Sequence, residues 1–260
     1  MVVDQSRAEN HSLADLGAVN GSRVVYRHSS ETGVSAARNE ACELAGQQIL
    51  VFTDDDIVVA PDWLGTIFRA ASDGADSELI TGRVRSIDTQ AGGFAPSLID
   101  DDSPKVYEGR IWDDVLFSGN MAFARSIFDR LGQFDTRLGV GGPYLSAADN
   151  DYCFRALEAG YRIRYAPDAV AYHHAWRKAT HYRRLMWRYG VGQGAYLTKH
   201  IRLSDRYTLM RLRDHLVFDV KAARRERTED PLASKALVAH AVGLLYGSTR
   251  WILLERLRGR

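Results

Sequence analysis

Three consecutive carboxylates, Asp54, Asp55 and Asp56, follow directly on an apolar run at residues 47–53. The run has the composition of a parallel strand buried on both faces, and open α/β sheets bind their ligands at the carboxyl ends of such strands. Neighbouring carboxylates repel one another unless a positive charge lies between them. Hard divalent cations prefer oxygen ligands and hold phosphorylated substrates, so the triplet predicts a metal–phosphate site. A solvated acidic turn is the alternative for the triplet alone.

Four further side chains stand where they could serve the same site. Asp4 and Arg38 lie at the end of a predicted strand and the start of a predicted helix, so both could face the same crevice. Asp149 could act from the far side as a general base, and His173 could offer a neutral imidazole to a metal. This set suits a donor whose leaving group is a diphosphate, with a cation offsetting its charge and a carboxylate deprotonating an incoming hydroxyl. Helix capping is the alternative for Asp149.

The elements that would position these side chains alternate between strand and helix along the first two thirds of the chain. Apolar, β-branched runs predict strands at residues 2–4, 23–27, 47–52, 79–84, 117–123, 161–165 and 169–172. Helical patterns predict helices at residues 36–45, 62–71, 126–131 and 149–159, and Ser35 is the predicted N-cap of the first. This alternation indicates βαβ units, and therefore a parallel sheet with helices on its faces.

The chain changes character beyond Trp176. Basic and aromatic residues are interleaved at residues 177–189, and an apolar segment at residues 236–254 is interrupted by His240 and Arg250. Arginine and aromatic side chains at helical spacing are typical of helices in a membrane interface. Because the apolar segment falls short of the ~20 residues needed to span a bilayer, it predicts a helix packed on the domain or resting on a membrane surface. No nucleic-acid motif accompanies the arginines, so nucleic acid is not an expected partner.

Composition argues against several classes of protein. The 260 residues are 45% hydrophobic and 26% charged, as in a globular protein, and the formal net charge of +1 argues against a general polyanion binder. Cys42 and Cys153 fall within predicted helices and indicate buried thiols in a reducing compartment. The first residues show no signal-peptide pattern. A cytoplasmic location is expected, with a peripheral place on the inner face of the plasma membrane as an option.

From Val2 to Trp176 the motifs follow one another in an order that resembles the family 2 glycosyltransferases. Enzymes of that family have the GT-A fold and use nucleotide-diphosphate sugars. The resemblance implies a GT-A (Rossmann-like) α/β domain at residues 1–176, with a mixed, mainly parallel sheet and flanking helices. Residues 177–260 would then form a helical, basic and aromatic C-terminal region.

The resemblance implies roles on the nucleotide side of the site. Asp4 is similar to the aspartate that ends the second strand of the GT-A fold and contacts the base, and Arg38 lies in a segment that matches G-x-x-x-A-R-N beside the nucleotide. The triplet resembles the D-x-D element. Asp54 and Asp56 would therefore serve the ribose-diphosphate and a divalent metal, Mn²⁺ or Mg²⁺, with Asp55 nearby.

The resemblance also implies roles on the sugar and metal side. Gly119 and Asn120 belong to a segment similar to the strand that borders the sugar and the acceptor. Asp149 lies in a segment similar to E-D-x-D-x-x-x-R, which makes it the catalytic base. His173 ends a segment that resembles P-x-A-x-x-x-H and is the implied metal ligand, with His174 in reserve. The implied reaction is inverting transfer to an acceptor hydroxyl. The basic, aromatic C-terminal region suggests that the acceptor is a glycan or is lipid-linked, in envelope polysaccharide or glycolipid synthesis.

Two departures from the family pattern leave alternatives open. The pattern's first strand is missing before Val2, and Ala148 stands where a glutamate is common. A catalytically degenerate protein that keeps the GT-A fold as a binding or scaffolding module is one alternative. A haloacid-dehalogenase-like phosphohydrolase is another, because residues 54–58 also satisfy D-x-D-x-[TV], although that class places the motif after its first strand. The sequence predicts no oligomeric state.

Overall fold

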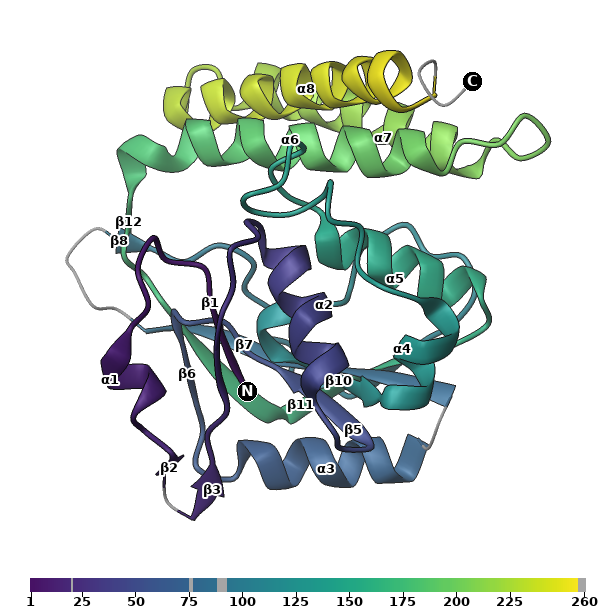
Figure 1. Cartoon of the computed structure of the whole chain (residues 1–260). Helices are drawn as coiled ribbons and strands as arrows, with labels where there is room; N and C mark the ends of the chain where they lie inside the picture. Colours follow the sequence, from purple (N-terminus) through teal and green to yellow (C-terminus); the bar gives the residue numbers. More distant parts are fainter. Residues whose placement is uncertain (20, 75–76, 88–92, 257–260) are drawn as a thin grey trace.

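The computed structural model describes residues 1–19, 21–74, 77–87 and 93–256, and its helices lie in layers around a central sheet (Figure 1). One face of the sheet is covered by α3 (Trp63–Gly74). The opposite face is covered by α2 (Val34–Leu44), α4 (Arg125–Leu131) and α5 (Ala148–Glu158). An outer layer beyond these helices consists of α6 (Tyr182–Lys199), α7 (Tyr207–Arg225) and α8 (Pro231–Trp251). A short helix, α1 (His11–Ala14), lies near the N-terminus.

The central sheet has the strand order β5-β10-β7-β11-β6, and β9 pairs with β11. The bounds are β5 (Ile49–Phe52), β6 (Ile57–Val59), β7 (Glu78–Ile87), β9 (Lys105–Tyr107), β10 (Met121–Ala124) and β11 (Arg162–His174). β7 and β11 run parallel, whereas the other described pairings in this sheet are antiparallel. Because β5 and β7 are both antiparallel to β10, these two strands point the same way. The mixed α/β sheet with flanking helices is present as predicted, but the expectation that it is mainly parallel is wrong, because β6, β9 and β10 each pair antiparallel with their neighbours.

Within the described residues, three short strand pairs lie outside the central sheet. β1 (Val2–Asp4) pairs in parallel with β4 (Tyr26–His28), which sets Asp4 opposite His28. The other pairs are β2 (Ala18–Val19) with β3 (Ser22–Arg23) and β8 (Gly93–Phe94) with β12 (Arg177–Lys178). The strand predicted at residues 23–27 is therefore wrong in its bounds, because Arg23 ends one strand and Tyr26 begins another.

A single strand, β11, replaces the two strands predicted at residues 161–165 and 169–172. Its register against β7 shifts between Ala166 and Val170, at an irregularity that contains Pro167. Proline has no N–H to donate to a neighbouring strand, and a bulge lets the strand continue past such a position. The uninterrupted strand runs from the centre of the sheet to His173 and His174 at its end.

The N-cap of helix α2 is Gly33. The sequence predicted Ser35 as the N-cap, and that prediction is wrong. Gly33 is the N-cap residue and has a φ of 113°, which glycine adopts without the steric cost of a side chain. Ser35 lies inside the helix, and its Oγ donates to the carbonyl oxygen of Leu138 at 2.8 Å. This bond ties α2 to the loop that precedes α5.

Apolar cores join the layers. The core between the sheet and α2, α4 and α5 includes Phe134 and Tyr152, whose stacked rings lie 4.2 Å apart. A second core places Trp63 of α3 under the other face of the sheet, and a third joins α5 to the outer helices. Cys42 and Cys153 are buried free thiols in the first core, which confirms the predicted burial of both.

Glycines bring α6 and α8 into close contact. A Cβ atom added at Gly194 would lie 2.1 Å from the carbonyl oxygen of Leu244, and one added at Gly247 would lie 2.0 Å from that of Val191. Backbone atoms cannot retreat as a flexible side chain can, so only glycine fits at these crossings. The outer helices therefore pack as one tight layer.

The last long helix is more extensive than the apolar segment predicted from the sequence. Residues Pro231–Glu255 form a helix long and apolar enough to cross a membrane, with a mean hydropathy of 1.3 over its best window. Of that window, 39% is buried inside the structure. Core helices of globular proteins meet the same criterion of length and composition, so this finding alone does not indicate a membrane span.

Candidate active site

Asp54 meets Arg38 where β5 ends. The Arg38 Nη2 donates to Asp54 Oδ1 at 2.8 Å, and the arginine side chain is 11% exposed. The other carboxylate oxygen, Oδ2, lies against Gly119, where an added Cβ atom would be 3.1 Å away. The same atom would lie 2.7 Å from the ring of Phe117, so glycine allows the backbone to approach Asp54. Arg38, at the start of α2, thus meets the first acid after β5, as expected from the sequence.

Asp149 lies in the first turn of α5, beside Ser118. The backbone N–H and the Oγ of Ser118 donate to Asp149 Oδ2 at 3.4 and 3.3 Å, and the N–H of Asn150 donates to Oδ1 at 3.1 Å. A carboxylate has about four acceptor positions, so some remain for a substrate. Loss of hydration raises the pKa of Asp149, against the opposing charge of Arg38. A carboxylate with a raised pKa in a recess is suited to accept a proton.

Asn120 is fully buried, and its side chain is occupied by protein groups. Its Nδ2 donates to the carbonyl oxygens of Arg83 and Ala169 at 2.8 Å, and its Oδ1 accepts from the Nε1 of Trp63 at 2.8 Å. Gly82 makes room for it, since a Cβ atom there would lie 2.3 Å from Nδ2. The side chain therefore fixes a 3-10 turn at Ser118–Asn120. The sequence predicted a strand from residue 117, but this turn comes first and strand β10 begins only at Met121.

Asp56 and His173 form a second polar cluster. The His173 Nε2 lies 3.2 Å from Asp56 Oδ2, and the Nε1 of Trp176 donates to the same oxygen at 3.0 Å. The His173 Nδ1 lies 3.0 Å from the carbonyl oxygen of Pro96, which can only accept, so this bond orients the ring with Nε2 toward Asp56. The guanidinium of Arg177 is 3.8 Å from the carboxylate.

The spacing of this second cluster fits a divalent cation. Adjacent ligands of an octahedral ion at about 2.0–2.1 Å lie roughly 3 Å from one another. The Asp56 Oδ2 and His173 Nε2 are 3.2 Å apart. Among the residues that the structure describes, no three His, Cys, Asp or Glu side chains converge on one point. The donor set therefore fits an ion that completes its shell with phosphate oxygens and water.

The two clusters flank one short segment. The Phe117 ring packs beside Gly119 on the Asp54 side, and its centroid lies 6.1 Å from that of His173 on the other. Asp55 is exposed in the turn between β5 and β6. The predicted residues Arg38, Asp54, Gly119 and Asp149 are thus brought together.

Asp4 stands apart from these clusters, at the end of β1. Its carboxylate accepts hydrogen bonds from the Ser6 N–H at 2.9 Å and the Tyr26 hydroxyl at 2.7 Å, and these bonds lower its pKa to about 2. Its neighbour Gln5 holds Gly33 through both ends of the side-chain amide, at 3.1 Å each. Asp4 therefore connects to the rest of the site through the start of α2.

Several residues that contribute to the site were not predicted from the sequence. Gln5 was not singled out, although it fastens β1 to α2. Trp176 was treated as a boundary, although it binds Asp56. Asp151 is fully buried and pairs with Lys199 and His200 at the end of α6, both at 2.8 Å. Sequence patterns carry no signal for such contacts because the partners are distant along the chain.

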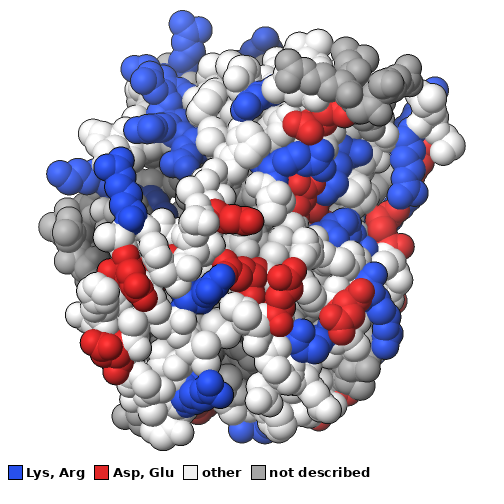
Figure 2. All heavy atoms as spheres, viewed as in Figure 1, with Lys and Arg blue, Asp and Glu red and all other residues white. Residues whose placement is uncertain are grey.

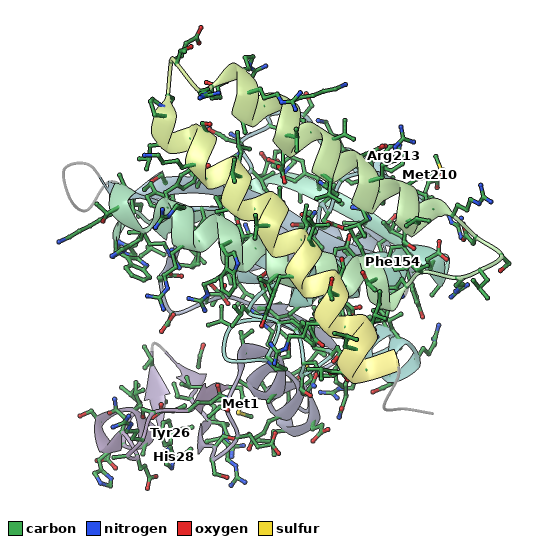
Figure 3. The ribbon with its side chains drawn as sticks, turned by 90° about the horizontal axis from the view of Figure 1, so that it is seen from above. Met1, Tyr26, His28, Phe154, Met210 and Arg213 are labelled. Atoms are coloured by element: carbon green, nitrogen blue, oxygen red, sulfur yellow. The ribbon has the colours of Figure 1, made fainter. Side chains whose placement is uncertain are left out.

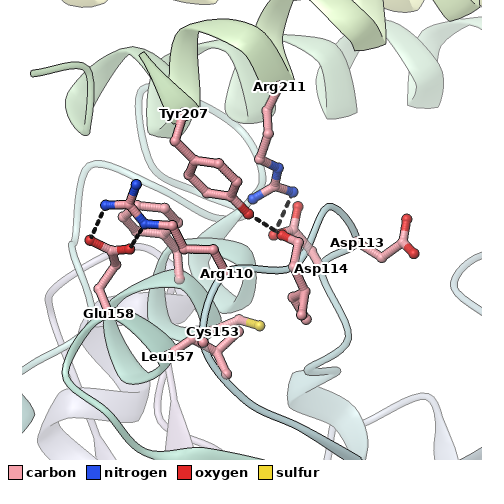
Figure 4. A pocket seen from close by; sticks show the side chains of 11 residues that line it. Arg110, Asp113, Asp114, Cys153, Leu157, Glu158, Tyr207 and Arg211 are labelled. Carbon is pink, nitrogen blue, oxygen red and sulfur yellow. Dashed lines mark hydrogen bonds and ion pairs between the residues drawn. The ribbon is translucent and has the colours of Figure 1, made fainter. Parts of the chain in front are cut away.

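A small cavity between α5 and α7 is not the donor site (Figure 4). Its volume is about 10 Å³, enough for about one water molecule. Arg211 is 2% exposed there and lies 3.2 Å from Asp114, while Arg110 pairs with Glu158. The cavity lies where α5 packs against α7 and is too small for a nucleotide.

The chain matches the model of Glycosyl transferase family 2 over residues 2–132, about half of its length, and it belongs to that family. The family predicted from the sequence is therefore confirmed. A curated relative, the glucosyl-dolichyl phosphate glucuronosyltransferase of Haloferax volcanii, is 24% identical over 195 residues. That match covers 72% of this chain, which spans only 62% of the length of the relative.

Solved structures show the same fold. The mannosyltransferase PcManGT from Pyrobaculum calidifontis, in complex with GDP-Man and Mn²⁺, has a TM-score of 0.55 at 17% identity, over 86% of this chain and 70% of its own. GalNAc-T7 with UDP, GalNAc and Mn²⁺ has a TM-score of 0.52 at 14% identity, over 98% of this chain and 50% of its own. These neighbours are GT-A glycosyltransferases, and the fold predicted from the sequence is confirmed.

Proposed function

We propose that this chain is an inverting, metal-dependent glycosyltransferase that moves a sugar from a nucleotide-diphosphate donor to an acceptor hydroxyl. The observation that carries the proposal is the meeting of the Arg38–Asp54 ion pair with the carboxylate of Asp149 beside the turn Ser118–Asn120. A cation and a metal-binding acid on one side, with a base on the other, are what displacement of a diphosphate requires.

Asp149 is the proposed general base. Its carboxylate takes the proton of the acceptor hydroxyl while the hydroxyl oxygen attacks the anomeric carbon. A new carbon–oxygen bond forms on one face of the sugar as the bond to the diphosphate breaks on the opposite face, so the configuration inverts. The raised pKa of Asp149 supports this role, because proton transfer is most effective when the pKa of the base approaches the working pH.

The donor is proposed to lie along the other side of the turn. Arg38 would offset phosphate charge, Asp4 would contact the base, and the Gly119 backbone would approach the sugar, with Asp55 near the diphosphate. Asp56 and His173 are the proposed holders of Mn²⁺ or Mg²⁺, supported by their 3.2 Å spacing, whereas Asp54, implied as a third ligand by the sequence, does not converge with them. When bound, the cation offsets the negative charge that develops on the leaving diphosphate.

The acceptor class is proposed from the relatives. The printed name of the Haloferax volcanii relative links it to a sugar carried on dolichyl phosphate. A lipid-linked or glycan acceptor of the cell envelope, and a cytoplasmic enzyme that works at the inner face of the membrane, agree with that relationship. Residues 1–176 would supply the catalytic domain and residues 177–260 the helical region. Trp176 and Arg177 both approach Asp56, so the two regions meet at the proposed metal site.

Calorimetry is expected to show that a nucleotide-diphosphate sugar binds more tightly with Mn²⁺ than with a chelator. Replacing Asp56 with alanine removes one of the two paired metal ligands, so the Mn²⁺-dependent gain in affinity is expected to fall by 10–100-fold. Asp62→Ala, at an exposed acid after β6, is the matched control and is expected to keep the gain. Equal affinity with and without Mn²⁺ in the unaltered chain would count against the metal site.

The pH dependence of transfer is a separate test of Asp149. Only the ionised carboxylate can accept a proton, and burial raises its pKa. We expect kcat/KM to decline as the pH falls through that raised pKa, so the acidic limb lies above the ~3.9 of a free aspartate. Initial rates from pH 4 to 8, at a fixed free concentration of Mn²⁺, measure this limb. A rate that stays constant down to pH 4 would contradict the assignment.

A degenerate binding module is the second candidate, because Ala148 occupies the position next to the base. Such a protein would bind the nucleotide sugar with Mn²⁺ and transfer nothing to any glycan or lipid-linked acceptor. The phosphohydrolase alternative has no support in the structure, where Asp54 is ion-paired with Arg38 within a family 2 fold.

A further inference from the structure

The outer face of α8 is apolar and uncovered. Seen from above, α8 lies across the molecule as its outermost helix (Figure 3). Large apolar side chains recur along one side of the helix at helical spacing and are 49–55% exposed: Val238, Val242, Leu245, Tyr246 and Leu253. A row of this length on an outer helix marks an interaction surface rather than scattered exposure.

A groove with a cationic rim adjoins this apolar face. It lies between the end of α7 and the start of α8 and has a volume of about 530 Å³. Its apolar lining comes from Val220, Ala223, Pro231 and Val238, and its cationic lining comes from Arg224, Arg227 and Lys235. Among the described ion pairs, none includes any of these three cations, so their charge is available to a ligand.

The charge around the groove extends along the same edge of the molecule. Figure 2 shows Lys and Arg side chains gathered in the upper left of the view, over the start of α6 and the turn between α7 and α8. Arg183 and Arg184 are exposed at the start of α6, and Lys221 is exposed near the end of α7. An apolar face beside a cationic edge has the chemistry of a surface for anionic amphiphiles.

We propose that the α7–α8 groove and the outer face of α8 form the surface by which the protein docks onto an anionic phospholipid membrane. Lipid phosphates would bind Arg224, Arg227 and Lys235 in the groove. The apolar side chains of α8 would enter the boundary between headgroups and acyl chains, with α8 parallel to the membrane.

The inference concerns binding alone and is independent of sugar transfer. The full chain is mixed with two kinds of sedimentable vesicle. One consists of phosphatidylcholine alone, and the other also contains roughly 30% of the anionic lipid phosphatidylglycerol. We expect binding to the anionic vesicles, weak binding to the neutral ones, and release as salt is raised, because ions screen exposed charges. Binding that ignores both lipid charge and salt would overturn the proposal.

Two pairs of variants locate the surface. Each cation near an anionic membrane contributes roughly five-fold in affinity, so R224Q/R227Q is expected to lower vesicle binding roughly 30-fold. R23Q/R69Q, with the same charge change at exposed sites on β3 and α3, is the control and is expected to bind normally. V242S/L245S tests the apolar face and is expected to weaken binding, while L64S/F68S, at similarly exposed apolar positions on α3, is not.

Light scattering on the same samples separates a membrane from a second copy of the chain. A monomer that loses vesicle binding on V242S/L245S supports the proposal. A dimer that dissociates on V242S/L245S and never binds vesicles would show that another subunit covers α8, and the proposal would fail. Equal losses for the control and test pairs would also overturn it, since the effect would then lie in net charge or folding.

Discussion

Asp149→Asn is expected to lower the rate of sugar transfer by about 10²–10⁴-fold, the usual contribution of a general base, and to leave donor binding nearly unchanged. The amide has almost the shape of the carboxylate and can still accept the hydrogen bonds from Ser118. It cannot take up a proton, so the acceptor hydroxyl must attack without being deprotonated. Turnover and donor affinity should therefore separate cleanly in this variant.

Transfer is measured under single-turnover conditions, and donor affinity is measured by calorimetry on the same preparation. Asp129→Asn is the matched control, since Asp129 is an exposed acid on neighbouring α4. The control is expected to retain full activity. An Asp149→Asn variant with undiminished transfer would remove Asp149 from the mechanism, whereas parallel losses of binding and turnover would place it in donor binding instead.

Asn120→Ala is expected to destabilise the fold by about 3 kcal/mol or more. The substitution leaves three buried partners without their hydrogen bonds, namely the carbonyl oxygens of Arg83 and Ala169 and the indole N–H of Trp63. Each unsatisfied buried group costs about 1–3 kcal/mol, although water entering the space would offset part of this. The free energy of unfolding, from urea titration monitored by circular dichroism, measures the effect.

The same variant distinguishes support of the fold from contact with the donor. Asn150→Ala, at a partly exposed asparagine of α5, is the control and is expected to change stability by less than about 1 kcal/mol. Asn120→Asp should be nearly as damaging as Asn120→Ala, because a carboxylate oxygen would face two carbonyl oxygens. If stability is unchanged while donor affinity is lost, Asn120 contacts the donor and the structural role is wrong.

From the sequence, Arg38, Asp54 and Asp149 of the candidate site were expected to lie close together because these residues lie at the ends of regular elements. Asp54 ends a strand and Arg38 lies near the start of a helix, and parallel β–α connections bring such positions to one edge of a sheet. Asp149 was found in the same way, in the first turn of α5. The periodic spacing of apolar residues, with Gly46 and Gly160 just after two of the predicted helices, was sufficient to place these elements within a few residues.

Contacts between elements could not be predicted because they depend on side-chain partners far apart in sequence. Asn120 has the residue type of a ligand-binding group, and only the structure shows Trp63, Arg83 and Ala169 around it. The sequence predicted two strands, one on either side of Pro167, yet a bulge carries a single strand, β11, past this residue. Tertiary packing decided whether Asn120 supports the fold or faces a ligand. It also decided whether the segment around Pro167 forms one strand or two.

The loop that leads into α5 is held by the C-terminal helices. The Ser146 Oγ donates to the carbonyl oxygen of Arg188 at 3.0 Å, an added Cβ atom at Gly192 would lie 2.1 Å from Ser146 Oγ, and Arg250 binds the carbonyl oxygen of Pro143. The position of Asp149, the proposed base, therefore depends partly on residues some 40 to 100 positions downstream of it. The C-terminal helices cannot be exchanged as an independent cassette: a chimera that takes them from another transferase must take this loop with them.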